Sequence, residues 1–250
     1  MKKTVVLLLC AALCNAALAQ LTGPLKLTTA QSNFGQFLSK SQLKQTTIMA
    51  DKAAAGITFN DEESTKGTRF LFNNWEKGDS VITRYGIALN VSSYLFNYDK
   101  MTGSLLASEN RKEALAVSAS GIQSFKLAFA NRQYNFEHVN VIDSSKFFLA
   151  LVKNKEKYSL YREFVVKFIP SNYRNDGLIA TGTLDNEYKD ESRYYLLMPD
   201  ATFRLIVFKP KAIKDILIKE KDKADQFFSR HKEDDINESF LIHLINEVNN

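Results

Sequence analysis

The sequence has only two cysteines, and both lie close to the N-terminus. Cys10 and Cys14 fall within residues 1–19, which have the three parts of a cleavable signal peptide. Lys2 and Lys3 come first, an apolar run follows, and small residues come last. We therefore expect an exported mature protein without thiols. Cysteine catalysis and thiolate metal sites are then excluded.

The residues at the end of this segment predict where it is removed. Ala17 and Ala19 supply the small side chains of an A-x-A cleavage site, which makes Gln20 the first mature residue. The apolar run, 5–13, is shorter than the about 20 residues that span a bilayer. A leucine precedes each cysteine, where a bacterial lipoprotein would have a small residue. We expect a periplasmic or secreted protein.

Charge of one sign and long apolar runs are also scarce. The chain has a formal net charge of +5, and removal of Lys2 and Lys3 leaves +3, with both signs scattered along the sequence. Nucleic-acid binding would need a concentrated basic patch, so we expect none. The mature region has no apolar run long enough for a transmembrane segment.

Aromatic residues, by contrast, are abundant. The 18 Phe and 10 Tyr against 10 Gly and 4 Pro favour strands and an aromatic core over disorder. From Thr68 to Phe208, short apolar runs alternate with Gly, Asn, Asp and Lys, which is typical of antiparallel strands joined by hairpins. Beyond Pro210 the apolar spacing becomes helical. We predict a mainly β (α+β) fold, an antiparallel meander forming a curved sheet, sandwich or partial barrel, followed by a short-helix C-terminal tail.

Four segments are expected along the chain. Residues 1–19 are the signal peptide, 20–66 a polar leading segment that is partly helical or flexible, 67–208 the antiparallel β domain, and 209–250 the helical tail. Within the β domain, residues 170–190 are rich in Asn, Asp and Gly and have the composition of a long loop. Long loops are often functional.

Three stretches resemble a broad group of uncharacterised exported proteins of Bacteroidetes-type bacteria. They are GTRFLFNNWEKGDSV at the start of the β domain, NVSSYLFNYDKMTGSL after it, and the lysine-rich helical close from Lys209 to Val248. The resemblance covers roughly residues 67–248. It implies export and a β module followed by a helical tail. No activity, cofactor or catalytic residue comes with it.

Side chains suited to catalysis are few and dispersed. His138, His231 and His243 have no partner at metal-binding or catalytic spacing. Glu137 adjoins His138, but neighbours on a strand point to opposite faces. The G-x-S-x-G, G-x-G-x-x-G and P-loop motifs do not occur. We therefore assign no catalytic, cofactor-binding or metal-binding residue and expect no cofactor.

Aromatic side chains give the one positive indication of binding. Trp75, Tyr194 and Tyr195 could line an apolar groove or a sugar platform, with His138 as a further candidate, or they could fill the core. We favour a non-catalytic binding or interaction module of the cell envelope, whose partner is an unknown protein or a small apolar or sugar ligand. A carrier of an apolar ligand in a β cavity and a hydrolase assembled only by folding are the alternatives, so enzymatic activity stays open.

Overall fold

The computed structural model describes residues 34–40, 49–50, 57–58, 65–177 and 179–250. These residues belong to a single unit, 33–250. The expected signal peptide and its cleavage residues Ala17, Ala19 and Gln20 lie outside the described residues.

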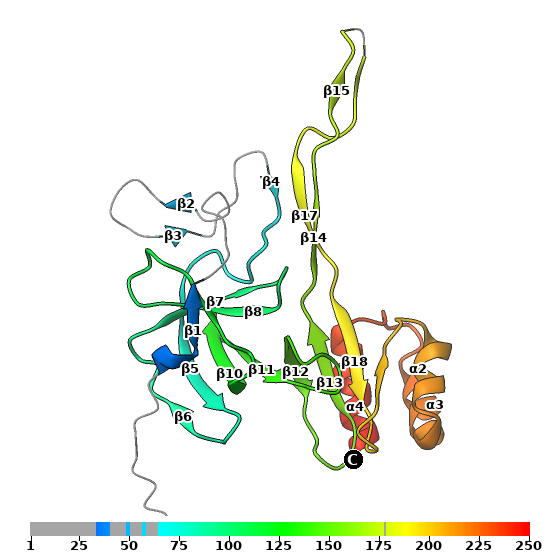
Figure 1. The fold of residues 1–250 in the computed structure, drawn as a ribbon. Coiled ribbons are helices and arrows are strands. Elements are labelled where there is room, and N and C mark those ends of the chain that lie inside the picture. Colours follow the sequence, from blue (N-terminus) through cyan, green and yellow to red (C-terminus); the bar gives the residue numbers. More distant parts are fainter. Residues whose placement is uncertain (1–33, 41–48, 51–56, 59–64, 178) are drawn as a thin grey trace, which may run out of the picture. The chain divides into compact units, whose positions relative to one another are not determined.

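Strands account for most of the regular structure, and the α-helices follow near the C-terminus (Figure 1). The strands are β1 (Leu38–Lys40), β2 (Met49–Ala50), β3 (Ile57–Thr58), β4 (Thr65–Lys66), β5 (Glu76–Thr83), β6 (Ala88–Leu89), β7 (Leu95–Asp99), β8 (Ser104–Ser108), β9 (Leu115–Val117), β10 (Ile122–Phe129), β11 (Arg132–His138), β12 (Phe147–Val152), β13 (Ser159–Glu163), β14 (Val166–Ile169), β15 (Arg174–Asn175), β16 (Ala180–Thr181), β17 (Asn186–Asp190), β18 (Arg193–Leu197) and β19 (Phe203–Leu205). The helices are η1 (Phe34–Phe37), α2 (Pro210–Ile216), η3 (Ile218–Glu220), α3 (Lys221–Arg230) and α4 (Glu238–Asn249).

One large sheet contains 12 of these strands. Its order is β1-β9-β8-β7-β5-β10-β11-β12-β13-β18-β19, with β6 beside β5, and neighbouring strands run antiparallel. Within the described residues its two ends, β1 and β19, do not pair, so the sheet is not closed into a barrel. The mainly β prediction is confirmed in the form of an open, curved sheet (Figure 1).

The main core lies inside the curved part of the sheet and consists largely of aromatic rings. The Phe136 ring centroid lies 4.6 Å from that of Tyr98 and 4.7 Å from that of Phe125. The Tyr98 hydroxyl donates to the Phe147 carbonyl at 2.9 Å, so its polar group is satisfied although buried. The buried members of the main core are Phe34, Phe72, Val81, Leu89, Val91, Phe96, Tyr98, Leu105, Ala107, Val117, Ile122, Phe125, Leu127, Phe136, Phe147, Leu149 and Phe164.

Part of the segment before residue 67 belongs to the same body. Phe34 in η1 is buried in the main core, where its ring contacts those of Tyr94 and Phe96. Strand β1 pairs with β9, and β4 pairs in parallel with β17. Packing against the core thus gives η1 and β1 ordered positions that the polar composition of 20–66 does not indicate.

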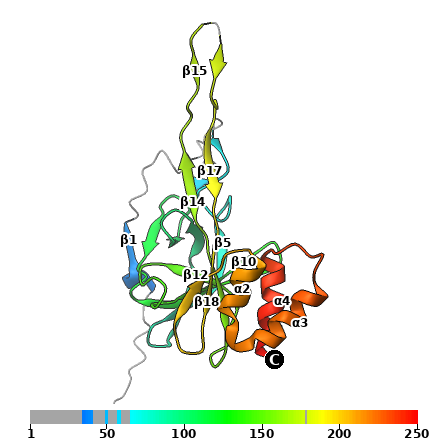
Figure 2. The same ribbon diagram turned by 90° about the vertical axis from the view of Figure 1, so that its right-hand side faces the viewer.

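The α-helices α2, α3 and α4 pack on one face of the sheet beside β13 and β18 (Figure 2). Helix α2 begins at Pro210, where the missing N–H costs nothing. Asn237 caps α4 by accepting from the Phe240 N–H at 3.0 Å. The apolar side of α4, including Leu241 and Leu244, is buried in a second core with Leu160 and Leu196. The expected helical tail is therefore confirmed.

Residues 166–190 form a long hairpin, here called the arm, rather than a loop. Strands β14 and β17 pair first, and β15 and β16 continue the ladder outward (Figure 1). Asn172 Oδ1 accepts from the Thr183 N–H at 2.7 Å, which joins the two limbs where regular pairing is interrupted. Gly177 and Gly182 have φ of 84° and 88°, so their positions favour glycine. The Asn and Gly that suggested a loop thus serve turns within a ribbon.

Candidate functional site

The residues proposed from the sequence do not come together. Trp75 is buried in a small cluster with Phe70 and Leu106. It therefore fills part of the core and does not line an exposed groove. Tyr194 and Tyr195 are neighbours on β18 and point to opposite faces of the sheet. Tyr194 therefore faces the helices, while Tyr195 packs against other side chains on the far face.

His138 is buried among groups that hold its ring in place. Its Nε2 lies 2.5 Å from the Ser144 carbonyl oxygen, to which it donates, and its Nδ1 lies 3.2 Å from Arg84 Nη2, from which it accepts. Glu137 lies on the opposite face and accepts from the Tyr161 hydroxyl. In the described part of the chain, no group of three His, Cys, Asp or Glu could hold a metal ion.

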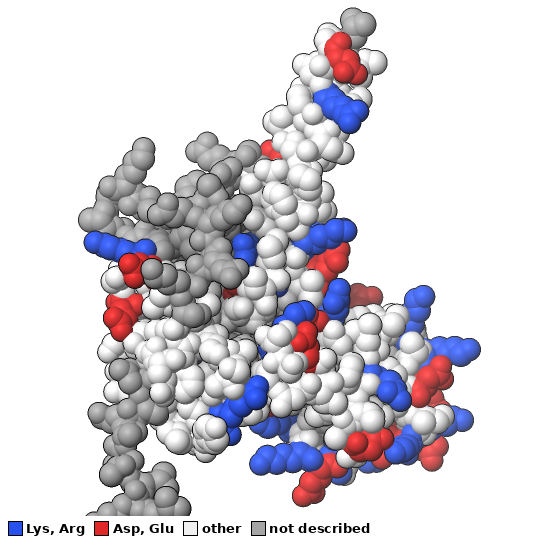
Figure 3. Space-filling model, viewed as in Figure 1, with Lys and Arg blue, Asp and Glu red and all other residues white. Residues whose placement is uncertain are grey.

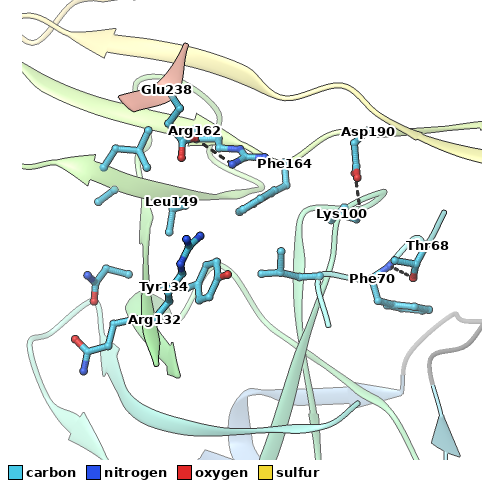
Figure 4. Close-up of a pocket in the computed structure, with 15 residues that line it drawn as sticks. Thr68, Phe70, Lys100, Arg132, Tyr134, Leu149, Arg162, Phe164, Asp190 and Glu238 are labelled. Atoms are coloured by element: carbon cyan, nitrogen blue, oxygen red, sulfur yellow. Dashed lines mark hydrogen bonds and ion pairs between the residues drawn. The ribbon is translucent and has the colours of Figure 1, made fainter. Parts of the chain in front are cut away.

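A groove opens at the rim of the main core, between β11, β12, β13, the base of the arm and the start of α4 (Figure 4). Its volume is about 610 Å³. Core residues such as Leu149 and Phe164 form part of its wall, and charged side chains project around them from the strands, from the turn between β7 and β8 and from α4. The lining residues are Thr68, Phe70, Leu71, Lys100, Arg132, Gln133, Tyr134, Asn135, Leu149, Ala150, Leu151, Arg162, Phe164, Asp190 and Glu238.

Both carboxylates of the groove are paired with cations. Arg162 Nη1 donates to Glu238 at 3.0 Å, and its guanidinium lies 4.3 Å from the centroid of the Phe164 ring. Lys100 is buried, and its Nζ donates to Asp190 at 2.6 Å. These pairs tie α4 and the base of the arm to the sheet. The walls of the groove are therefore fixed by charged hydrogen bonds.

The arm presents large apolar side chains to solvent. Phe168 and Tyr173 are about two-fifths exposed, at 41% and 43%, and Ile179 and Leu184 reach 70% and 68%. On the face shown in Figure 3, charged side chains gather over the helices, and the arm also has residues of both signs, with Arg174 and Asp176 near its tip. Single exposed apolar residues are ordinary, but four on one thin ribbon form an unusual concentration.

Burial and hydrogen bonds to carboxylates keep two tyrosines protonated. Tyr194 lies on the sheet face next to the helices, and Tyr195 lies on the opposite face. Burial raises the pKa of Tyr194 to about 12; Glu238, which accepts its hydroxyl hydrogen, acts in the same direction, and Arg162 opposes both. Burial also raises the pKa of Tyr195 to about 12, and the hydrogen bond to Glu163 adds to this. Folding therefore favours the neutral phenol at both positions.

The free energy of unfolding is expected to fall as pH rises above 10. An unfolded tyrosine ionises near pH 10, about two units below the folded pKa of about 12 for Tyr194 and Tyr195, so the folded state retains protons that the unfolded state releases. This contribution is complete below pH 10 and is lost as pH approaches 12. Urea unfolding on either side of pH 10 measures it. Tyr194→Phe should lessen the slope, and an unchanged slope would contradict the assignment.

No protein family, curated protein or solved structure matches the chain. The resemblance to exported Bacteroidetes-type proteins therefore stays a prediction. Among the described residues, no helix is long and apolar enough to cross a membrane. The groove was not predicted from the sequence, since Arg132, Arg162 and Glu238 are far apart in the chain and have no motif in common.

Proposed function

We propose that this chain is an exported protein of the cell envelope that acts as a non-catalytic interaction module, with the arm as its contact surface for a partner protein. The concentration of exposed apolar side chains on the arm supports the proposal. Export rests on the signal-peptide pattern of residues 1–19. Catalytic activity forms no part of the proposal, and the hydrolase alternative stays untested.

The construction of the arm favours a role in contact. At its base the arm is three-stranded, because β4 pairs with β17, but its outer part is a two-stranded hairpin, and an isolated hairpin of this kind is at best marginally stable in water. Ile179 and Leu184 lie near its end and are mostly exposed, where they add nothing to the main core. A limb such as 166–177 spans about 40 Å at roughly 3.3 Å per residue. A partner that covers this ribbon would bury its apolar side chains and stabilise its ladder.

Site-specific photo-crosslinking in the producing cells tests the arm. A photoreactive side chain at Ile179 is expected to give one discrete protein adduct, because this position lies in the proposed contact. The matched control is Tyr85, which is 90% exposed in the turn between β5 and β6 and should give none. Leu184→Ser should reduce the Ile179 adduct several-fold without changing the thermal unfolding of the body.

Equal adducts from Ile179 and Tyr85, or none from either, would contradict the arm proposal. A second variant separates contact from folding. Replacing residues 171–185 by an Asn-Gly turn keeps the paired base of the hairpin and removes its outer part. The shortened protein should unfold at the same temperature as the full-length protein. With a photoreactive group at Phe168, it should lose the adduct that the full-length protein gives.

A further inference from the structure

Of the three cations of the groove, Arg132 is the one without a carboxylate partner in the described part of the chain. It begins β11 and lies on the same face of that strand as Tyr134 and Phe136, which belong to the rim and centre of the main core. Figure 4 shows its side chain directed into the groove. Among the described residues its guanidinium has no ion pair, whereas Lys100 and Arg162 each have one.

The charges around the groove favour an anion. Three cations, Lys100, Arg132 and Arg162, line it together with two carboxylates, and both carboxylates are paired. One positive charge is therefore left over, and it belongs to the side chain that reaches into open space. A guanidinium presents a planar set of N–H donors that matches a carboxylate, with two parallel hydrogen bonds.

The lining of the groove is more polar than apolar overall, but the wall next to Arg132 includes apolar surface that an apolar body on the same ligand would cover. Leu71, Tyr134 and Leu151 are half-buried side chains that pack on the main core and leave part of their surface in the groove. Hydrocarbon placed over them would remove that surface from water. The volume of about 610 Å³ lies within the range of roughly 300–1,000 Å³ typical of small-molecule sites.

We propose that this groove binds a small amphipathic carboxylate of the fatty-acid type. Its carboxylate accepts two hydrogen bonds from Arg132, and its chain lies over Leu71, Tyr134 and Leu151. The interior of the curved sheet is filled by aromatic rings, so the chain lies at the rim of the core rather than within it. The arm contributes Asp190 to this site at its base, whereas the exposed apolar side chains of the arm lie outside the groove, so either proposal can fail without the other.

Calorimetric titration of the mature protein with three probes tests both halves of the ligand. Decanoate has the charge and the chain, decanol has the chain alone, and acetate has the charge alone. We expect decanoate to bind at least about tenfold more tightly than decanol, since hydrogen bonds to charged groups are worth about a factor of ten or more. Acetate should give no measurable binding. Higher salt should weaken decanoate binding because Arg132 is exposed.

Variants assign the charge preference to one residue. Arg132→Gln should lower the affinity for decanoate to that for decanol. Arg204→Gln, at an exposed arginine on β19 outside the groove, should leave both affinities unchanged. Leu151→Asn should weaken both probes, and thermal unfolding of each variant shows whether it is folded. The proposal is overturned if native protein does not bind decanoate, if decanol binds equally well, or if Arg132→Gln binds decanoate unchanged.

Discussion

Replacing Phe136 by alanine is expected to lower the free energy of unfolding by about 3–5 kcal/mol. The side chain is fully buried, and its ring lies against those of Tyr98, Phe125 and Phe164, with centroids 4.6, 4.7 and 6.0 Å away. These neighbours come from β7, from β10 and from the residue that follows β13, and they cannot all move to fill the space that a ring leaves. The loss thus includes both the transfer of the ring to water and the cavity that remains. Urea unfolding of the two proteins measures it.

The matched control for Phe136 is a phenylalanine outside the core. Phe168 is 41% exposed on the arm, and its ring lies 5.0 Å from that of Tyr188. Phe168→Ala removes the same atoms but leaves no buried cavity, so its cost should be about 1 kcal/mol, the size of an exposed aromatic pair. Similar losses in the free energy of unfolding of the two variants would mean that Phe136 does not hold the main core together.

The mainly β fold can be predicted from the sequence because apolar and polar residues that alternate in the sequence are alternately buried and exposed along the strands. In β10, for example, Phe125 and Leu127 are buried and Lys126 between them is exposed. The same rule separates Tyr194 from Tyr195, and it explains why two adjacent aromatic residues do not make one platform. The change to helical spacing beyond Pro210 is equally local, and the helices lie where it predicts them.

The arm and the groove depend on pairing between distant residues, which single-sequence patterns do not contain. Phe168 pairs with Tyr188 only because the ladder of β13 and β18 continues outward through a stretch with loop-like composition. In the groove, Arg162 reaches Glu238 because α4 docks beside β13. Neither neighbour is marked by a motif. The strand register of the arm and the docking of α4 against the sheet therefore cannot be predicted from single-sequence patterns.

The Arg69–Asp99 pair should be the second most sensitive point of the body. Asp99 is a buried carboxylate, and Arg69 holds it with two hydrogen bonds, from Nε at 2.8 Å and from Nη2 at 2.6 Å. Thr102 and the Met101 N–H bind the same carboxylate, which places the turn between β7 and β8. Arg69→Met leaves this charge buried without its cation, and we expect a loss of about 3–5 kcal/mol in the free energy of unfolding.

A double variant distinguishes an uncompensated charge from lost packing. In Arg69→Met/Asp99→Asn, the amide is neutral. Its oxygen, in place of Oδ1, accepts from the Met101 N–H, and its NH2 group, in place of Oδ2, donates to the Thr102 hydroxyl, so the protein should be more stable than the single Arg69→Met variant. Lys66→Met is the exposed control, because Lys66 pairs with Asp185 while its own side chain is 75% exposed. Its cost should stay within about 1 kcal/mol. If the double variant is less stable than Arg69→Met alone, the buried charge is not the cause, and the arginine side chain stabilises the turn through its packing.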